Sequence, residues 1–343
     1  MSKLKALVTA EIIPEVIESL SDRIHFVYDG YNIDHNVMPH SELAEKISQY
    51  DILISEYDTI DKQVFDNAKN LKMIICCRGG VKSVVDIDEA MSHGVIVCNN
   101  AGRNAGAVSD MTIAYILDLT RNISYTNSLI HNRKITSDLM TKPSEYKDTV
   151  WGLDNDSPFI KYRGKSVNHM KLGLVGLGHA GQLVAYKAKA FGMEILGYDP
   201  YVDEETLPNY IKKVTFDELL ADSDIISLHC VYTPQTKYMF SKNTFLKMKK
   251  GSYFINTSRG GLVNEDDLVE ALNNGYLAGA AIDVTDKEPI SADSPLLDAK
   301  NLIITPHIAG SSYDVQVVGS EMVLESLETY LAGKKPANCV VYK

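Results

Sequence analysis

The chain has 343 residues, of which 45% are hydrophobic and 23% are charged, which is ordinary for a globular protein and excludes a disordered or fibrous one. A single hydrophobic core seldom grows beyond about 250–300 residues, so the length predicts two domains. The net charge of −11 opposes binding to nucleic acid, because that binding depends on clustered Lys and Arg. No apolar run reaches the ~18 residues of a membrane span, so we expect no membrane partner.

The cysteines argue against a metal site and against a disulfide framework. They are odd in number and lack paired CxxC spacing, and most lie in apolar, strand-like runs. The five are Cys76, Cys77, Cys98, Cys230 and Cys339. The N-terminus lacks the long apolar stretch of a secretory signal peptide. We therefore expect buried thiols, no metal and a reducing, cytoplasmic compartment.

The first hundred residues alternate β-branched runs with helical patterns. The predicted strands cover residues 5–10, 24–28, 51–54, 73–77 and 95–98, and helical patterns such as 41–49 and 61–69 lie between them. Strands that alternate with helices run parallel, so this array predicts a doubly wound open sheet of the flavodoxin type.

A second array follows a long helical pattern over residues 105–131 and a polar, irregular excursion over residues 138–168. Its predicted strands cover residues 171–175, 194–198, 224–228, 252–256, 278–282 and 302–305. The last helical pattern, 313–331, is too short for a third domain, and we expect it to fold back on the first array. The chain is thus predicted to be an α/β protein with two doubly wound parallel-sheet domains.

A glycine motif, Gly176-Leu-Gly178-His-Ala-Gly181, joins a predicted strand to an alanine-rich helix over residues 180–190. In this setting the first glycine permits a tight turn, the second admits a pyrophosphate and the third lets helix and strand pack closely. The motif predicts a Rossmann dinucleotide site made by Gly176, Gly178, His179, Ala180 and Gly181. A glycine-rich turn without a ligand is the alternative.

Asp199 strengthens the dinucleotide prediction. It follows the next predicted strand, 18 residues after Gly181. A carboxylate there would accept hydrogen bonds from both ribose hydroxyl groups of NAD. We therefore expect residues 104–308 to form the NAD-binding domain. Residues 1–103 with 309–343 would form a discontinuous substrate domain.

Three further motifs follow in the second array: Asn256-Thr-Ser-Arg-Gly-Gly-Leu-Val263, Ala280-Ala-Ile-Asp-Val-Thr-Asp-Lys-Glu-Pro289 and Thr305-Pro-His-Ile-Ala-Gly310. In this order they resemble the D-isomer-specific 2-hydroxyacid dehydrogenase family, and the similarity covers nearly the whole chain. The resemblance implies an NAD-dependent oxidoreductase that acts at the 2-position of a small D-2-hydroxy acid or 2-keto acid. It also implies a short, phosphoglycerate dehydrogenase-like form and a homodimer.

The resemblance makes Arg259, Glu288 and His307 the catalytic set, and all three follow predicted strands. Arg259 would hold the substrate carboxylate with its planar fork and polarise the keto oxygen. His307 would exchange a proton with that oxygen while Glu288 holds the imidazole. Taken singly, each could instead be a surface charge, a turn residue or a structural histidine.

Other positions carry over from the resemblance. Asp283 would face the nicotinamide carboxamide, and Val108 would lie against the nicotinamide. The remaining predicted cofactor-lining residues are Cys230, Thr257 and Ser258.

The substrate carboxylate would meet backbone N–H groups in the loop Arg78, Gly79, Gly80 and Val81. In the usual pattern of this loop the glycines are spaced, whereas here they are adjacent and follow Arg78. The orientation of the substrate is therefore not determined by the resemblance.

Two related functions remain as alternatives. Transcriptional corepressors that sense NAD resemble this family, but an intact Arg, Glu and His set is better explained by turnover. Formate dehydrogenases place glutamine where Glu288 stands, which disfavours them.

Overall fold

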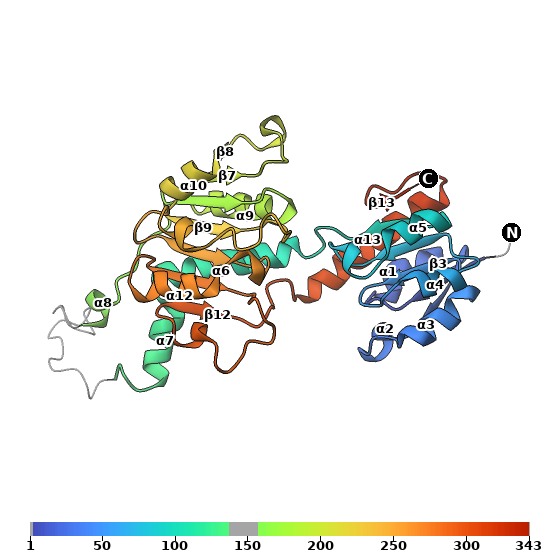
Figure 1. Ribbon diagram of the computed structural model, residues 1–343, viewed down its shortest axis with the longest axis horizontal. Helices are drawn as coiled ribbons and strands as arrows, with labels where there is room; N and C mark the ends of the chain where they lie inside the picture. The colour runs from blue at the N-terminus through green and yellow to red at the C-terminus, as the bar shows by residue number, and fades with distance from the viewer. Residues whose placement is uncertain (1–2, 137–156, 343) are drawn as a thin grey trace. The chain divides into compact units, whose positions relative to one another are not determined.

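Two α/β units make up the chain. The structure is a computed structural model that describes residues 3–136 and 157–342. One unit consists of Met1–Asn104 with Ser311–Lys343, and the other of Ala105–Gly310. Each has a central sheet between layers of helices (Figure 1), so the predicted fold class is confirmed.

The first unit has a six-stranded sheet in the order β13-β5-β4-β3-β1-β2. The order β2-β1-β3-β4-β5 is that of flavodoxin-type sheets, as predicted. A strand that the sequence pattern did not predict, β13, pairs antiparallel with β5. The strands are β1 Leu4–Val8, β2 Ile24–Tyr28, β3 Ile52–Ser55, β4 Met73–Cys76, β5 Ile96–Asn99 and β13 Cys339–Val341, and the helices are α1 Pro14–Ile17, α2 Tyr31–Asp34, α3 His40–Lys46, α4 Lys62–Asn67, α5 Ile87–His93 and α13 Tyr313–Leu331.

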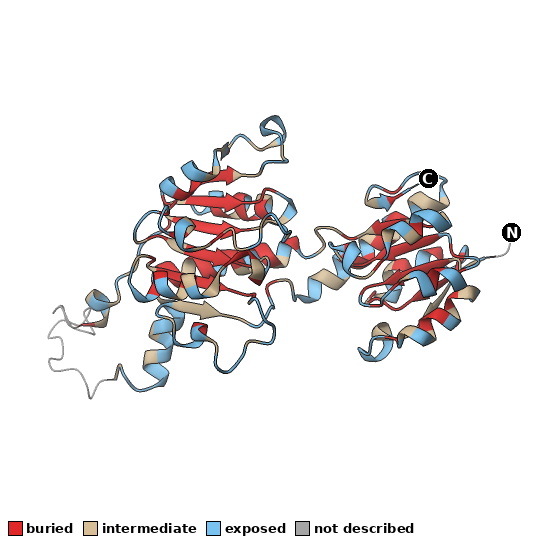
Figure 2. Cartoon of the chain, viewed as in Figure 1, coloured by how far each residue is buried: buried red, intermediate tan, exposed pale blue. Residues whose placement is uncertain are grey.

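Most strand residues of this sheet are buried (Figure 2), and their side chains pack into two apolar clusters. Alternating strand residues such as Leu7 and Leu53 pack with helices α3 to α5, whereas their neighbours pack with Val323 and Leu327 of α13. Ser320 of α13 also accepts a hydrogen bond from the backbone N–H of Ile13, at 2.9 Å. The last helix of the chain therefore covers the first sheet.

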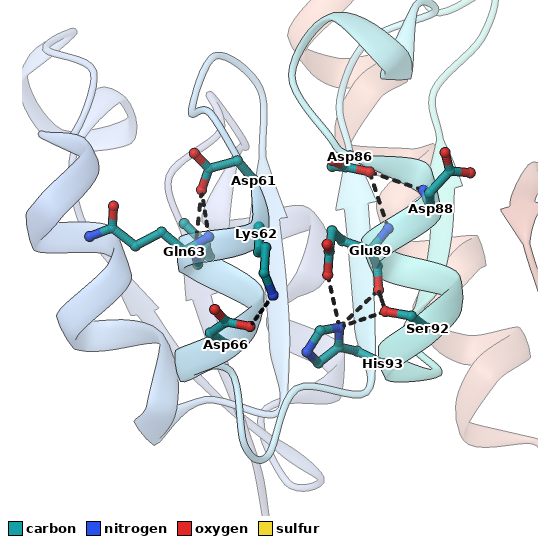
Figure 3. A network of polar contacts seen from close by, with 10 residues as sticks. Asp61, Lys62, Gln63, Asp66, Asp86, Asp88, Glu89, Ser92 and His93 are labelled. Atoms are coloured by element: carbon teal, nitrogen blue, oxygen red, sulfur yellow. Dashed lines mark hydrogen bonds and ion pairs between the residues drawn. The ribbon is translucent and has the colours of Figure 1, made fainter.

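Aspartate caps fix where α4 and α5 begin (Figure 3). The Asp61 carboxylate accepts hydrogen bonds from the first-turn N–H groups of α4 at 3.0 and 3.4 Å, and Asp86 accepts two from α5, both at 3.1 Å. A cap of this kind stabilises a helix by about 1 kcal/mol. The loops that leave β3 and β4 are also joined by a parallel bridge between Ile60 and Val85, so both loops are anchored at their far ends.

The second unit has a seven-stranded parallel sheet in the order β12-β11-β10-β9-β6-β7-β8. Counted within the unit, this is the Rossmann order 3-2-1-4-5-6 with one strand added. The strands are β6 Lys171–Val175, β7 Glu194–Tyr198, β8 Ile211–Lys213, β9 Ile225–Leu228, β10 Tyr253–Asn256, β11 Gly279–Ile282 and β12 Leu302–Ile304, and the helices are α6 Ala105–Arg121, α7 Ile123–His131, α8 Pro158–Lys161, α9 His179–Ala190, α10 Phe216–Asp222, α11 Lys242–Phe245 and α12 Glu265–Asn273.

The helical pattern over residues 105–131 is two helices rather than one. Asn122 has a left-handed backbone, with φ of 57°, and ends α6 before α7 begins. Helix α6 packs with α9 over the sheet, and Lys187 of α9 donates hydrogen bonds to the Ser109 hydroxyl at 2.6 Å and to the Asp110 carboxylate at 2.7 Å. These contacts hold the N-terminal end of α6 against the helix that follows the glycine motif.

Most of the predicted excursion over residues 138–168 lies outside the described residues, and its remainder includes α8, which Ser157 caps. Among residues 3–136 and 157–342, no helix is both long enough and apolar enough to cross a membrane. Within the same ranges, no group of three or more His, Cys, Asp or Glu side chains could hold a metal ion.

Candidate active site

Three neighbouring strands end beside the residues predicted to be catalytic. Arg259 follows β10, Glu288 follows β11 and His307 follows β12, and these strands are adjacent in the sheet. Because the strands are parallel, their carboxyl ends meet at one edge, which is where doubly wound sheets bind ligands. Residues separated by 48 positions in sequence, from 259 to 307, are thereby brought to the same edge.

His307 and Glu288 form a direct pair. Nδ1 of His307 lies 2.7 Å from Oε2 of Glu288, and the two side chains are 47% and 39% exposed. The other carboxylate oxygen accepts a hydrogen bond from the N–H of Thr285, at 3.2 Å. An exposed pair of this kind contributes little to stability, but it fixes the tautomer and orientation of the ring. In the described part of the chain no residue hydrogen-bonds Nε2.

Asp283 holds the backbone around His307. Its buried carboxylate accepts hydrogen bonds from the N–H groups of Ile308 at 2.8 Å and Ala309 at 2.7 Å, and from the hydroxyl of Thr305. His307 itself has φ of 56°, a left-handed conformation that costs roughly 1–2 kcal/mol. The resemblance did not reveal this bracing role. A contact of Asp283 with a nicotinamide carboxamide stays a prediction.

Arg259 is exposed and stands on a closely packed turn. Its Nη1 donates to the carbonyl oxygen of Ser258 at 2.6 Å, and no carboxylate in the described residues pairs with it. A Cβ atom on Gly260 would overlap the backbone of Thr285 and Asp286. Only glycine therefore lets the Arg259 turn approach the loop that carries Glu288.

The glycine motif has the three environments that a dinucleotide turn requires. Gly176 has φ of +100°, and a Cβ atom there would lie 2.6 Å from the backbone of His229. A Cβ atom on Gly181 would overlap the carbonyl oxygen of Gly176, whereas one on Gly178 would meet nothing within 4 Å. The first and third positions are closed by protein, and the second is open to a ligand.

The N-terminus of α9 is available to an anion. Gly178, His179 and Ala180 open this 12-residue helix, Gly178 and His179 are exposed, and no side chain caps the first turn. Unpaired N–H groups and the positive end of the helix dipole favour phosphate. The arrangement therefore fits the pyrophosphate of a dinucleotide.

Asp199 lies directly beside this turn. Its carboxylate accepts hydrogen bonds from the N–H groups of Leu177 and Tyr201, both at 2.9 Å. A carboxylate has about four lone-pair sites, so acceptor capacity remains for the two ribose hydroxyl groups. The structure thus connects the predicted acid to the glycine turn.

The remaining predicted cofactor residues lie around the start of α6 and the ends of β9 and β10. The hydroxyl of Thr112 donates to the carbonyl oxygen of Val108 at 2.8 Å and lies 3.3 Å from the hydroxyl of Thr257. The Ser258 hydroxyl donates to the carbonyl oxygen of Leu228 at 2.6 Å. Cys230 is packed near Met239, and burial raises the pKa of its thiol to about 11, so the sulfur is neutral.

The predicted substrate loop, Arg78 to Val81, follows β4 in the other unit. Arg78 and Gly79 are held by backbone and side-chain contacts with Asn100 and Asn99. No described residue accepts a hydrogen bond from the N–H of Gly79 or Gly80, and a Cβ atom on Gly80 would meet nothing within 4 Å. Unpaired N–H groups beside open space fit an anionic ligand.

Comparison with known proteins agrees with this geometry. Residues 113–309 match a family model described as D-isomer specific 2-hydroxyacid dehydrogenase, NAD binding domain. A hydroxypyruvate reductase from Blautia hydrogenotrophica is 34% identical over 299 residues, covering 87% of each chain. A glyoxylate reductase from Thermococcus litoralis is 32% identical over 312 residues, covering 90% of this chain and 88% of its own.

Two further matches concern length and fold. A D-3-phosphoglycerate dehydrogenase from Archaeoglobus fulgidus is 32% identical over 340 residues, which cover 98% of this chain but 59% of that relative. The crystal structure of the TT0316 protein from Thermus thermophilus aligns with a TM-score of 0.76 at 30% identity, covering 98% of this chain and 100% of its own.

The open space at Gly178 leads to a test that separates binding from folding. The unfolding temperature of Gly178→Ala should stay within about 2 °C of that of the unmodified protein. Its affinity for NADH should fall at least tenfold, because the new methyl group occupies the space proposed for the pyrophosphate. Gly181→Ala is the matched control. It should lower the unfolding temperature clearly, since its Cβ overlaps the backbone of Gly176. Thermal unfolding and NADH fluorescence titration measure both effects, and normal NADH affinity in Gly178→Ala would remove this turn from the cofactor site.

Proposed function

The chain belongs to the D-isomer specific 2-hydroxyacid dehydrogenase family, and we propose that Arg259, Glu288 and His307 are its catalytic residues. It is an oxidoreductase that uses NAD and acts on a small hydroxy or keto acid. The observation that carries the proposal is the 2.7 Å contact between His307 and Glu288, at the sheet edge where Arg259 also lies.

His307 is the proton donor of the reduction. Its Nδ1 faces Glu288, so Nε2 is the ring atom that would give a proton to the substrate's keto oxygen and take it back in the oxidation. Glu288 keeps the ring oriented through this hydrogen bond. The hydrogen bonds that Asp283 accepts from Ile308 and Ala309 fix the backbone that carries His307.

Arg259 binds the substrate carboxylate. Its guanidinium has no carboxylate partner among the described residues and can present two parallel N–H groups. The same positive charge draws electron density from the adjacent keto carbon, which becomes a better hydride acceptor. In the first unit, the loop of Arg78, Gly79, Gly80 and Val81 is also proposed to bind the substrate, through the free N–H groups of Gly79 and Gly80.

Gly176, Gly178, Gly181 and the first turn of α9 would hold the pyrophosphate, and Asp199 the adenosine ribose. Further cofactor contacts are proposed for Val108, Cys230, Thr257, Ser258 and Asp283. When bound, NAD supplies or accepts the hydride, and this chemistry belongs to the cofactor. The protein binds and orients the cofactor and the substrate, and it polarises the keto group of the substrate.

We place the substrate domain in the first unit and the cofactor domain in the second. A homodimer is supported by exposed apolar side chains on α7 and α8, including Ile123, Ile130 and Phe159; a monomeric mass in light scattering would contradict it. Five free cysteines support a reducing compartment such as the cytoplasm, which fluorescence microscopy of a tagged chain can test.

Turnover of small 2-keto acids tests the proposal most directly. The purified protein should oxidise NADH with at least one of glyoxylate, hydroxypyruvate and 2-oxobutyrate. Arg259→Lys should fold and bind NADH normally but lose roughly 100-fold or more in kcat/KM, because an ammonium group cannot form the bidentate clamp. Lys287→Gln, an exposed charge beside Glu288, is the matched control and should stay within threefold. Activity of Arg259→Lys close to that of the unmodified enzyme would contradict the role of Arg259.

Removal of each partner tests the pairing of His307 with Glu288. Glu288→Gln replaces the charged acceptor at Nδ1 of His307 with a neutral amide that orients the ring less firmly, so kcat/KM should fall about tenfold. His307→Ala removes the proton donor and should lose about 100-fold or more. Unchanged kcat/KM in Glu288→Gln would show that the carboxylate does not position the proton donor.

Asp199 predicts a preference for NADH over NADPH of about 100-fold or more. Two unit charges 4 Å apart repel by about 4 kcal/mol at an effective dielectric constant of 20, and half of that repulsion already corresponds to roughly 30-fold. Asp199→Asn retains a side-chain acceptor for the turn but removes the charge, and it should narrow the preference at least tenfold. Asp203→Asn, an exposed acid four residues away, should leave the preference unchanged. Equal kcat/KM for the two cofactors in the unmodified enzyme would show that Asp199 does not face the ribose.

A further inference from the structure

A guanidinium group without an acidic partner lies at the carboxyl ends of β3 and β4 in the first unit. Arg78 leaves β4, and its guanidinium carbon is 5.5 Å from the centre of the Tyr57 ring. In the described chain no side chain forms an ion pair or hydrogen bond with this guanidinium. All five of its N–H donors are therefore available to a ligand.

The surroundings hold Arg78 in place. Its N–H donates to the carbonyl oxygen of Cys76 at 2.7 Å, and its own carbonyl oxygen accepts from Asn100 at 3.3 Å. The Tyr57 ring beneath it packs edge-on against Tyr31, with ring centres 4.7 Å apart. Contact with an aromatic face orients a guanidinium without neutralising its charge. The Arg78 guanidinium is therefore oriented by the Tyr57 ring and keeps its full charge.

The acidic groups nearest in sequence have other partners. Glu56 is buried, and its carboxylate pairs with Arg103. Asp58 is also buried and accepts hydrogen bonds from the hydroxyl groups of Thr9 at 2.5 Å and Ser55 at 2.7 Å. Burial, reinforced by the Glu56 charge, raises the pKa of Tyr57 above its usual value, so the phenol stays neutral. Arg103 thus has an acidic partner, whereas Arg78 has none in the described chain. Oε2 of Glu56 and Oδ1 of Asp58 are buried without a hydrogen-bond partner.

We propose that Arg78, supported by Tyr57, binds a second anionic group of the substrate, so that the enzyme prefers 2-keto acids that carry an additional carboxylate or phosphate. The inference rests on the proposed function, in which the N–H groups of Gly79 and Gly80 contribute to binding of the first carboxylate. Arg78 precedes these two glycines in the same loop, and its guanidinium is free for another anion.

Substrate pairs that differ in one anionic group test this proposal. Oxaloacetate and 2-oxobutyrate differ in a terminal carboxylate, and 3-phosphohydroxypyruvate and hydroxypyruvate differ in a phosphate. For at least one pair the dianionic member should have about tenfold higher kcat/KM, and the pair that shows it identifies the anion. Arg78→Gln should lower kcat/KM for that member about 10- to 100-fold, mainly through KM. The monoanionic member should change less than threefold.

Lys82→Gln is the matched control, because it removes an exposed positive charge from the same loop without touching the proposed subsite. It should change kcat/KM for both members less than threefold. Equal losses for both members in Arg78→Gln would overturn the proposal, since Arg78 would then serve the first carboxylate. Absence of any dianion preference in the unmodified enzyme would also overturn it.

A binding measurement separates this proposal from the proposed function. Calorimetry of the protein saturated with NADH should show tighter binding of D-malate than of D-2-hydroxybutyrate, with the difference lost in Arg78→Gln and kept in Lys82→Gln. If no keto acid is reduced but this Arg78-dependent difference is present, the subsite stands and the proposed function fails. If reduction occurs without any difference in either assay, the proposed function stands and the subsite fails.

Discussion

The hydrogen bonds to the buried Asp283 carboxylate are the interaction on which the proposed proton donor depends. Three donors reach this carboxylate after β12: the hydroxyl of Thr305 and the N–H groups of Ile308 and Ala309. A buried carboxylate is costly unless it is hydrogen-bonded in this way. Thr305 also contacts the hydroxyl of Tyr115 on α6. The ends of β11 and β12 and helix α6 therefore share one polar centre, and the left-handed backbone of His307 lies within it.

Close backbone approaches provide the second constraint on the site. Gly260 lets the Arg259 turn meet the backbone that leads to Glu288, and Gly181 lets α9 begin against the carbonyl of Gly176. In both places a methyl group would overlap protein atoms, so any larger residue must move a loop. At Gly178, in the same unit, a Cβ atom would meet nothing within 4 Å. The crowded glycines therefore serve the packing of the protein, whereas the open one, Gly178, is the position proposed to receive a ligand.

Much of the fold could be predicted because continuous apolar, β-branched runs mark buried parallel strands. The ranges 24–28, 171–175 and 194–198 are strands with the predicted bounds, and the terminal helix covers 313–331 as predicted. The short edge strands β8 and β13 were missed, since each has only one buried residue and so little pattern to detect. The break between α6 and α7 was also missed, because the left-handed backbone of Asn122 leaves no mark in the apolar periodicity.

Candidate site residues could be predicted from sequence where they directly follow a strand. They could not be predicted where their role depends on a partner far away in the sequence. Arg259, Glu288 and His307 each stand after a recognisable strand, so a motif reveals them. Glu56 and Arg103 are 47 positions apart, and no periodicity joins them. The folded first unit gives Arg103 an acidic partner, and in the described chain it gives Arg78 none. Which of the two arginines is free for a ligand is therefore a property of the fold that no sequence pattern reveals.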